Sequence, residues 1–178
     1  AIGDNEFQFI DESGKIVIHD KYHDVREFSE GLAAVKWGHR WGFIDSLGNK
    51  VLHFNYDDCG SFSDGLAPVK TGLKWGYIDK NGTVVIESRY IEAAEFSGGL
   101  AEVKNGSKRL YIDTGGERVI EAGFFRTTPF SGGLAAVANH QVTPRAYEYI
   151  DSTGTSVFDI EFQYAGPFKN GLGVIRQD

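Results

Sequence analysis

One five-residue segment recurs through the chain at a fixed spacing, and this repetition constrains the fold more than any other feature. The pattern Gly-Leu-Ala-x-Val begins at Gly31, Gly65, Gly99 and Gly133, always 34 residues apart, and a degenerate copy begins at Gly171 after 38 residues. Such a period indicates that one supersecondary unit has been copied and that no copy buries its apolar face alone. We therefore expect a single domain, residues 1–178, with repeats at about residues 5–36, 39–70, 73–104, 107–138 and 145–176.

A second pattern, an aromatic residue followed by Ile and Asp, has the same period, with a glycine three residues after the aspartate. The carboxylate can accept backbone N–H bonds and the glycine can adopt positive φ, so each DxxG segment predicts a tight turn. Calcium binding would need several converging oxygens, as in a dense run of alternating acids, and no such run occurs. Turn formation is therefore the role we expect for Asp11, Asp45, Asp79, Asp113 and Asp151.

Each repeat contains three β-favouring runs separated by turns. A tight turn, Trp37-Gly38 in the first copy, separates Gly-Leu-Ala-x-Val from the aromatic-Ile-Asp run, and the DxxG turn leads into an apolar pair such as Val51-Leu52. The runs predict a three-stranded antiparallel meander, for example over residues 31–53. Because glycine and β-branched residues are frequent and no long stretch has a 3.6-residue period, we expect an all-β fold. Apolar residues on both faces of the strand at 31–35 predict sheets packed face to face.

The two ends of the chain carry complementary parts of a meander. Residues 5–19 supply only its second and third strands, and residues 171–176 supply only its first strand. Pairing of 172–176 with 7–11 would complete a fifth meander and hide two sheet edges, as a split blade does in a propeller. We favour five-bladed, propeller-like closure, with an open β-solenoid or superhelical array as the alternative.

Residues 41–45 (WGFID) and 75–79 (WGYID), followed by the DxxG turn and then by Phe-Ser-x-Gly-Leu-Ala-x-Val, resemble the bacterial WG repeat, also called the KWG repeat. The similarity covers nearly the whole chain, although one copy has Arg109-Leu110 in place of Trp-Gly. The resemblance implies a β-rich region of a bacterial protein, exported or at the cell envelope, with interaction roles and no catalytic residues to transfer. Long arrays in some members of that family keep the open array as an alternative.

Composition narrows the classes of partner. The net charge is −7 and the eighteen basic residues are scattered, which argues against a nucleic-acid backbone as ligand. The chain has no run of eighteen apolar residues, so we expect no membrane insertion. Cys59 is the only cysteine, which excludes an intramolecular disulfide and a cysteine-based zinc site, and we interpret it as a small buried residue.

No enzyme or cofactor motif is present. The sequence lacks GxSxG, HExxH, a dinucleotide-binding glycine motif and a P-loop, and the recurring Ser29, Ser63, Ser97 and Ser131 have no recurring histidine or acid partner. We therefore expect a non-enzymatic protein with no cofactor. Histidines spread over different repeats rarely converge to tetrahedral metal geometry, so we expect no metal site either.

Most aromatic residues are explained by the repeat. Nineteen of the twenty-four fall in four repeating columns, which predicts that they pack in the core, and Phe158 fills an aliphatic column. Repetition gives no shared structural role to the remaining four, which makes them better candidates for recognition. These are Trp37, Phe54, Phe125 and Tyr164.

One rim of the array collects further residues that the repeat does not explain. In the meander, the turn between the first and second strands lies at the same end as the close of the third strand, where we expect all five histidines. A four-residue insertion between Val137 and Tyr147 lengthens the same turn, and insertions in repeat proteins often lie on the binding face. The candidate binding residues are Trp37, His39, Arg40, His53, His140 and Arg145.

These features predict a protein- or peptide-interaction module that displays variable turns on rigid sheets. The alternative is a lectin-like propeller that binds one sugar per blade. Such sugar sites would repeat the same residues in each copy, whereas the turn tips differ, which favours a single composite surface. The tips are Trp37-Gly38, Thr71-Gly72, Asn105-Gly106 and Asn139-His140.

Overall fold

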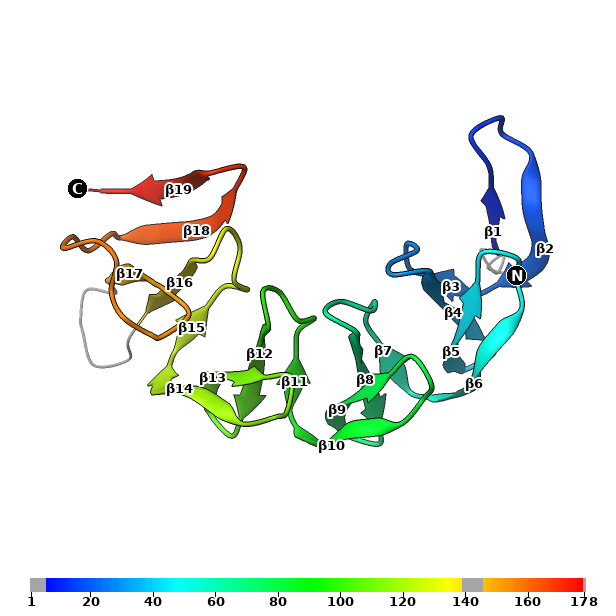
Figure 1. Ribbon diagram of the computed structural model, residues 1–178, viewed down its shortest axis with the longest axis horizontal. Helices are drawn as coiled ribbons and strands as arrows, with labels where there is room; N and C mark the ends of the chain where they lie inside the picture. The colour runs from blue at the N-terminus through cyan, green and yellow to red at the C-terminus, as the bar shows by residue number, and fades with distance from the viewer. Residues whose placement is uncertain (1–5, 139–145, 178) are drawn as a thin grey trace, which may run out of the picture. The chain divides into compact units, whose positions relative to one another are not determined.

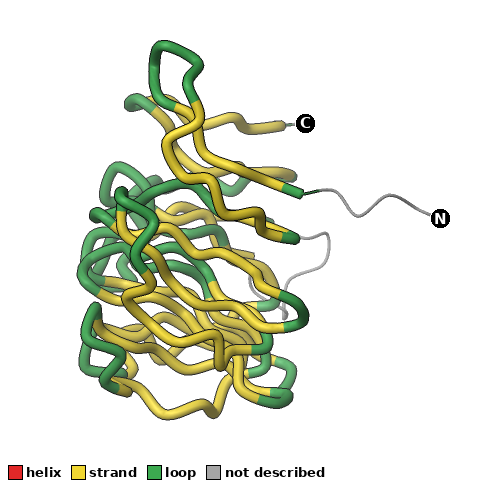
Figure 2. Tube along the Cα trace, turned by 90° about the vertical axis from the view of Figure 1, so that its right-hand side faces the viewer, coloured by secondary structure: helices red, strands yellow, loops and turns green. Residues whose placement is uncertain are grey.

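The computed structural model describes residues 6–138 and 146–177, and all regular structure within them is β-strand (Figure 2). No described segment forms a helix with the length and apolar character needed to cross a membrane. The chain forms two compact units, residues 1–88 and 89–178.

The first unit contains a hairpin followed by two four-stranded antiparallel sheets, drawn in blue to green in Figure 1. The hairpin pairs β1 with β2, and the sheets have the orders β3-β4-β5-β6 and β10-β9-β8-β7. Its strands are β1 (Phe7–Ile10), β2 (Ile16–Tyr22), β3 (Asp24–Val25), β4 (Leu32–Trp37), β5 (Arg40–Asp45), β6 (Lys50–Tyr56), β7 (Asp58–Cys59), β8 (Leu66–Thr71), β9 (Lys74–Asp79) and β10 (Val84–Tyr90), of which the last two residues belong to the second unit.

The second unit contains a four-stranded, a three-stranded and a two-stranded sheet. Their orders are β11-β12-β13-β14, β15-β16-β17 and β18-β19. The strands are β11 (Glu92–Ala93), β12 (Leu100–Asn105), β13 (Lys108–Asp113), β14 (Arg118–Phe124), β15 (Arg126–Thr127), β16 (Ala135–Ala138), β17 (Tyr147–Ile150), β18 (Tyr164–Lys169) and β19 (Leu172–Arg176).

The predicted meander is confirmed, with one strand added. In the first full copy β4 pairs with β5 from Leu32 opposite Asp45 to Trp37 opposite Arg40, and β5 then pairs with β6. A two-residue strand, β3, pairs with the outer edge of β4, and β7, β11 and β15 do the same in later copies. Sequence patterns missed these strands because two residues are too few to show a period.

The turn between β4 and β5 begins one residue later than predicted. Because Trp37 pairs with Arg40, the two central residues are Gly38 and His39, not Trp37 and Gly38. Gly38 has φ of 61° and His39 is not among the residues with positive φ, which is the pattern of a type II′ hairpin turn. Trp37 is therefore the last residue of a strand, and the strand fixes the direction of its side chain.

The five DxxG turns form as predicted. In the second of them, Oδ1 of Asp45 accepts hydrogen bonds from the backbone N–H of Leu47 at 2.9 Å and of Asn49 at 2.8 Å, while Gly48 has φ of 83°. The pKa of the Asp45 carboxyl lies below its ordinary value, first because the Asn49 side chain donates to it and then because backbone N–H groups do. The pKa of Asp79 is lowered chiefly by the backbone N–H of Thr83.

These lowered pKa values predict acid-sensitive stability. A carboxyl with a lowered pKa in the folded state stabilises the fold above its unfolded pKa of about 3.9, and this contribution is lost as the pH falls through the folded value. The melting temperature should therefore fall as the pH drops from about 5 to about 2. The double variant Asp45→Asn/Asp79→Asn should show a shallower fall, whereas the exposed control Asp159→Asn should follow the wild type. Equal slopes for the two variants would contradict this role of the turn carboxylates.

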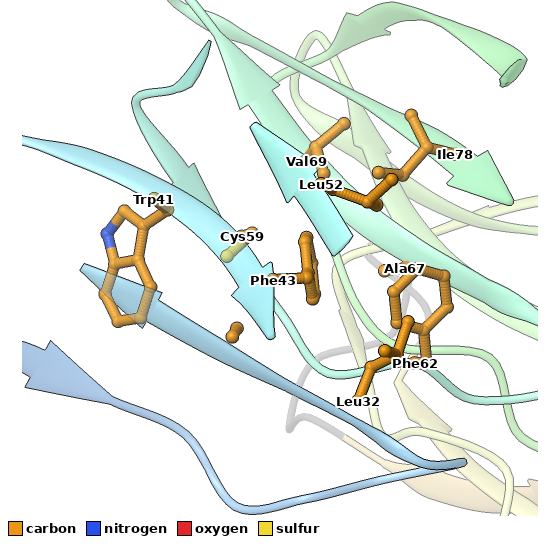
Figure 3. Packing of buried hydrophobic residues seen from close by; sticks show 10 residues of the cluster. Leu32, Trp41, Phe43, Leu52, Cys59, Phe62, Ala67, Val69 and Ile78 are labelled. Carbon is orange, nitrogen blue, oxygen red and sulfur yellow. The ribbon is translucent and has the colours of Figure 1, made fainter. Parts of the chain in front are cut away.

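The cores lie between successive sheets, as the apolar faces of the first strand predicted. Leu32 and Ala34 on one face of β4 join a cluster with Phe62, Ala67 and other residues of the next repeat (Figure 3). Ala33 and Val35 on the other face pack with Ile18 and Tyr22 of the preceding hairpin. Cys59 is fully buried in the first cluster and burial raises the pKa of its thiol, so it is an inert packing residue as predicted.

The terminal strands are each described in a two-stranded sheet. β1 pairs with β2, and β19 pairs with β18. These pairs do not test the expected pairing of residues 172–176 with 7–11, so closure of the array stays a prediction.

Candidate functional site

Four of the six predicted binding residues lie in the described part of the first unit, and all four are exposed. Trp37 ends β4, His39 lies in the following turn, Arg40 begins β5 and His53 lies within β6. His140 and Arg145 lie outside the described residues.

Trp37 forms one wall of an aromatic cavity in the first unit. Its ring lies 6.0 Å from that of Tyr22 and 6.3 Å from that of Phe54, measured between ring centroids, and 52% of its surface is exposed. Lys50 Nζ lies 5.9 Å from the centroid of the Phe54 ring. The cavity has a volume of about 340 Å³ and is completed by Asp20, Ile44 and Gly48. Two of the four aromatic residues that the repeat does not explain are thus brought together.

The aromatic pair that walls this cavity does not recur in the next copy. One period after Trp37 and Phe54 stand Thr71 and Ser88, and neither can replace an aromatic ring as a wall. The cavity depends on two aromatic substitutions that occur together in a single copy.

The other predicted residues of this rim do not line the cavity. Nη1 of Arg40 forms an ion pair with Oδ1 of Asp57 at 2.5 Å, which neutralises its charge. His39 and His53 are exposed and are not among the residues that line the cavity. Of the four predicted rim residues that the structure describes, Trp37 therefore lines this cavity, and the three polar ones do not.

Two residues of the rim have a structural role instead. Nδ1 of His23 accepts a hydrogen bond from the backbone N–H of Gly38 at 3.1 Å. One repeat later, Oδ2 of Asp57 accepts the equivalent bond from Gly72 at 2.7 Å. Both side chains anchor a hairpin turn, so a side-chain acceptor at this position serves the fold in these two copies.

The remaining two unexplained aromatic residues line a second site, in the second unit. Phe125 and Tyr164 border a cavity of about 630 Å³ together with Tyr147, Arg126 and Lys104. A neighbouring cavity of about 700 Å³ shares Arg126, Tyr147 and Tyr164 with it. The Tyr147 and Tyr164 ring centroids lie 6.0 Å apart. Sequence reasoning assigned Tyr147 to a packing column and did not select Arg126, although the charge at the position of Arg126 differs from that in the first three repeats.

A network of ion pairs stands next to this second site. Arg109 donates to the carboxylates of Glu102 and Glu92, and Lys104 Nζ lies 2.8 Å from Oε1 of Glu92. The hydrogen bond from Lys104 is the largest cause that lowers the pKa of Glu92, and that from Arg109 adds to it. Only 8% of the Glu102 side chain is exposed, so its charge depends on Arg109 for compensation.

The cavities present aromatic faces, guanidinium and ammonium groups and hydroxyls at the surface. In the part of the chain that the structure describes, no group of three or more histidine, cysteine, aspartate or glutamate side chains is arranged to hold a metal ion.

A comparison with known families finds the same five repeats that the sequence pattern predicts. Five stretches of the chain match the model of the WG containing repeat, at residues 9–36, 41–74, 75–108, 111–139 and 149–178. The chain belongs to this family. A search of curated proteins found no significant match. The cavities contain aromatic residues, Trp37 and Tyr164, that have no aromatic counterpart at the equivalent positions of the other repeats.

Proposed function

We propose that the chain is a non-enzymatic module that binds a protein or peptide through side chains that its repeats do not share. The observation that carries this proposal is the placement of Trp37, Phe54, Phe125 and Tyr164 in open cavities, two in each unit. In the described part of the first unit, the regular meander supports the aromatic cavity at Trp37 and Phe54. A scaffold of this kind holds its contact residues rigidly, which limits the entropy lost on binding.

The size of the Trp37 cavity fits an anchor side chain. Its volume of about 340 Å³ is near the lower end of ligand pockets, which span about 300–1,000 Å³. Tryptophan, tyrosine and arginine dominate the binding energy of protein interfaces, where they cluster in well-packed pockets. One apolar side chain of a partner, packed against the exposed faces of Trp37 and Phe54, would exclude water from both rings.

A lectin-like function is the alternative that this geometry also supports. A half-exposed tryptophan face with Asp20 and Lys50 beside it can stack on one sugar ring and accept or donate hydrogen bonds. One sugar per repeat is disfavoured because Thr71 and Ser88 replace the aromatic pair in the next copy. For the architecture we retain the proposal of five-bladed, propeller-like closure, supported by the complementary end strands, with an open array as the alternative.

The variant Trp37→Ala tests the proposed function. Peptides selected from a random display library on the intact chain should bind Trp37→Ala at least tenfold more weakly, about 1.4 kcal/mol, because the cavity loses a wall. Leu73→Ala is a matched control, since Leu73 is an apolar side chain that is 85% exposed at the equivalent turn of the next repeat. Selected peptides that bind both variants equally would contradict the proposal. Glycan binding at a stoichiometry near five would instead support the lectin.

A further inference from the structure

The first three repeats place opposite charges across the same pair of strands. The short strand carries an acid and the following strand carries a lysine directly opposite. The pairs are Asp24 with Lys36, Asp58 with Lys70, and Glu92 with Lys104. In the third pair the side chains form an ion pair at 2.8 Å. Opposite charges at such cross-strand positions stabilise a sheet and neutralise each other.

The fourth and fifth repeats break this rule. At the fourth copy Arg126 replaces the acid, and the residue opposite it is Ala138. At the fifth copy Tyr164 replaces the acid, and the residue opposite it is Arg176. Both arginines therefore lack the cross-strand carboxylate that the earlier copies provide. Neither of them forms an ion pair with any residue that the structure describes.

The two arginines face the same cavity. Arg126 and Arg176 line the cavity of about 700 Å³ together with Tyr147, Tyr164 and Gln163, and Val174 and Ile175 complete it. The adjoining cavity shares Arg126 and adds Lys104 and Arg109. No acidic side chain is among the described residues that line either one. Lys104 and Arg109 are paired with Glu92 and Glu102, so the uncompensated positive charge here is that of Arg126 and Arg176, in a chain with net charge −7.

We propose that this surface binds an acidic segment of the partner, in which carboxylates flank an apolar or aromatic side chain. The inference rests on the proposed function and names the chemistry of the partner. Guanidinium groups pair with carboxylates through two parallel hydrogen bonds, and this pairing is stronger than that of neutral groups. The rings of Tyr147 and Tyr164, with Val174 and Ile175, form apolar surface between the charges. That surface suits a peptide better than a free anion or an acidic sugar, because neither of those carries apolar side chains.

Titration calorimetry on the intact chain tests the inference. The probe is an acetylated, amidated peptide of the sequence Glu-Glu-Phe-Glu-Glu, and its glutamine analogue is the matched control. We expect the acidic peptide to bind at least tenfold more tightly than the analogue, with an affinity that falls as salt is added. The variant Arg126→Gln/Arg176→Gln should lose at least tenfold in affinity for the acidic peptide. Arg118→Gln, an exposed arginine of the same unit outside both cavities, should stay within twofold of the wild type.

Several outcomes would overturn the inference. These are equal binding of the two peptides, an unchanged affinity in the double arginine variant, and tighter binding of inorganic phosphate or oligogalacturonate than of the acidic peptide. Failure of the proposed function can be distinguished from failure of this inference, because the test of the proposed function uses Trp37 and library-selected peptides. A Trp37-dependent peptide together with no binding of the acidic probe would overturn only the role of the two arginines.

Discussion

Replacing Arg109 by alanine is expected to lower the free energy of unfolding by about 3 kcal/mol. The variant leaves the carboxylate of Glu102, which is 8% exposed, without the guanidinium that compensates its charge. Removal of one partner from a buried pair costs about 3–5 kcal/mol, and the lower end applies because 28% of the Arg109 side chain is exposed. Urea denaturation followed by circular dichroism measures the loss. Arg118→Ala, an exposed arginine on the next strand, should change stability by less than about 0.5 kcal/mol.

A double replacement tests whether the lost stability comes from the buried charge. Trp41 and Ala34 occupy the equivalent positions in the first full copy, where they belong to one apolar cluster. The variant Arg109→Trp/Glu102→Ala should therefore recover most of the stability that Arg109→Ala loses, since a buried ion pair can be replaced by apolar residues of suitable volume. If the double variant is no more stable than Arg109→Ala, uncompensated charge is not the cause of the loss.

The parts of the fold that could be predicted from the sequence are those set by local chemistry. The turn at Asp45 needs only an acceptor side chain and a glycine three residues later, and both can be seen in the sequence. The alternation of Leu32 and Ala33 between two faces follows from strand geometry, and the structure places them in different clusters. Because the same turn and strand patterns recur in several copies, each copy supports these predictions independently.

The candidate sites depend on contacts between residues of different repeats, and the pattern within one repeat does not show such contacts. Trp37 and Phe54 were singled out as aromatic residues without a repeated role, but only packing shows that they share a cavity with Tyr22 of the preceding repeat. Tyr147 was assigned to the core by its column, yet it lines both cavities of the second unit. A comparison of charges along the columns would have revealed the change from Glu92 to Arg126, but it could not have placed Arg176 beside it.

The glycine of the WG pair has a steric explanation in the first two full copies. A Cβ at Gly42 would lie 2.8 Å from the carbonyl oxygen of Leu52, and one at Gly76 would lie 2.4 Å from that of Ile86. The β5–β6 pairing shifts register beside Gly42, so the opposite backbone comes close at this position. The third full copy carries Leu110 at this position. The need for glycine therefore belongs to individual copies and not to the repeat as a whole.

The variant Gly76→Ala is therefore expected to destabilise the chain by about 3 kcal/mol, at the upper end of the cost of overpacking. The added methyl group would also lie 2.7 Å from the backbone nitrogen of Ser88 and 2.9 Å from the carbonyl carbon of Glu87, so three backbone atoms of β10 must move, and backbone yields less readily than a side-chain end. The melting temperature should fall by about 10 °C. Lys74→Ala, an exposed position two residues earlier on β9, should melt within about 2 °C of the wild type. Equal melting temperatures for the two variants would show that β9 and β10 separate at this point without loss of stability, and would remove the steric reason for glycine in the WG pair.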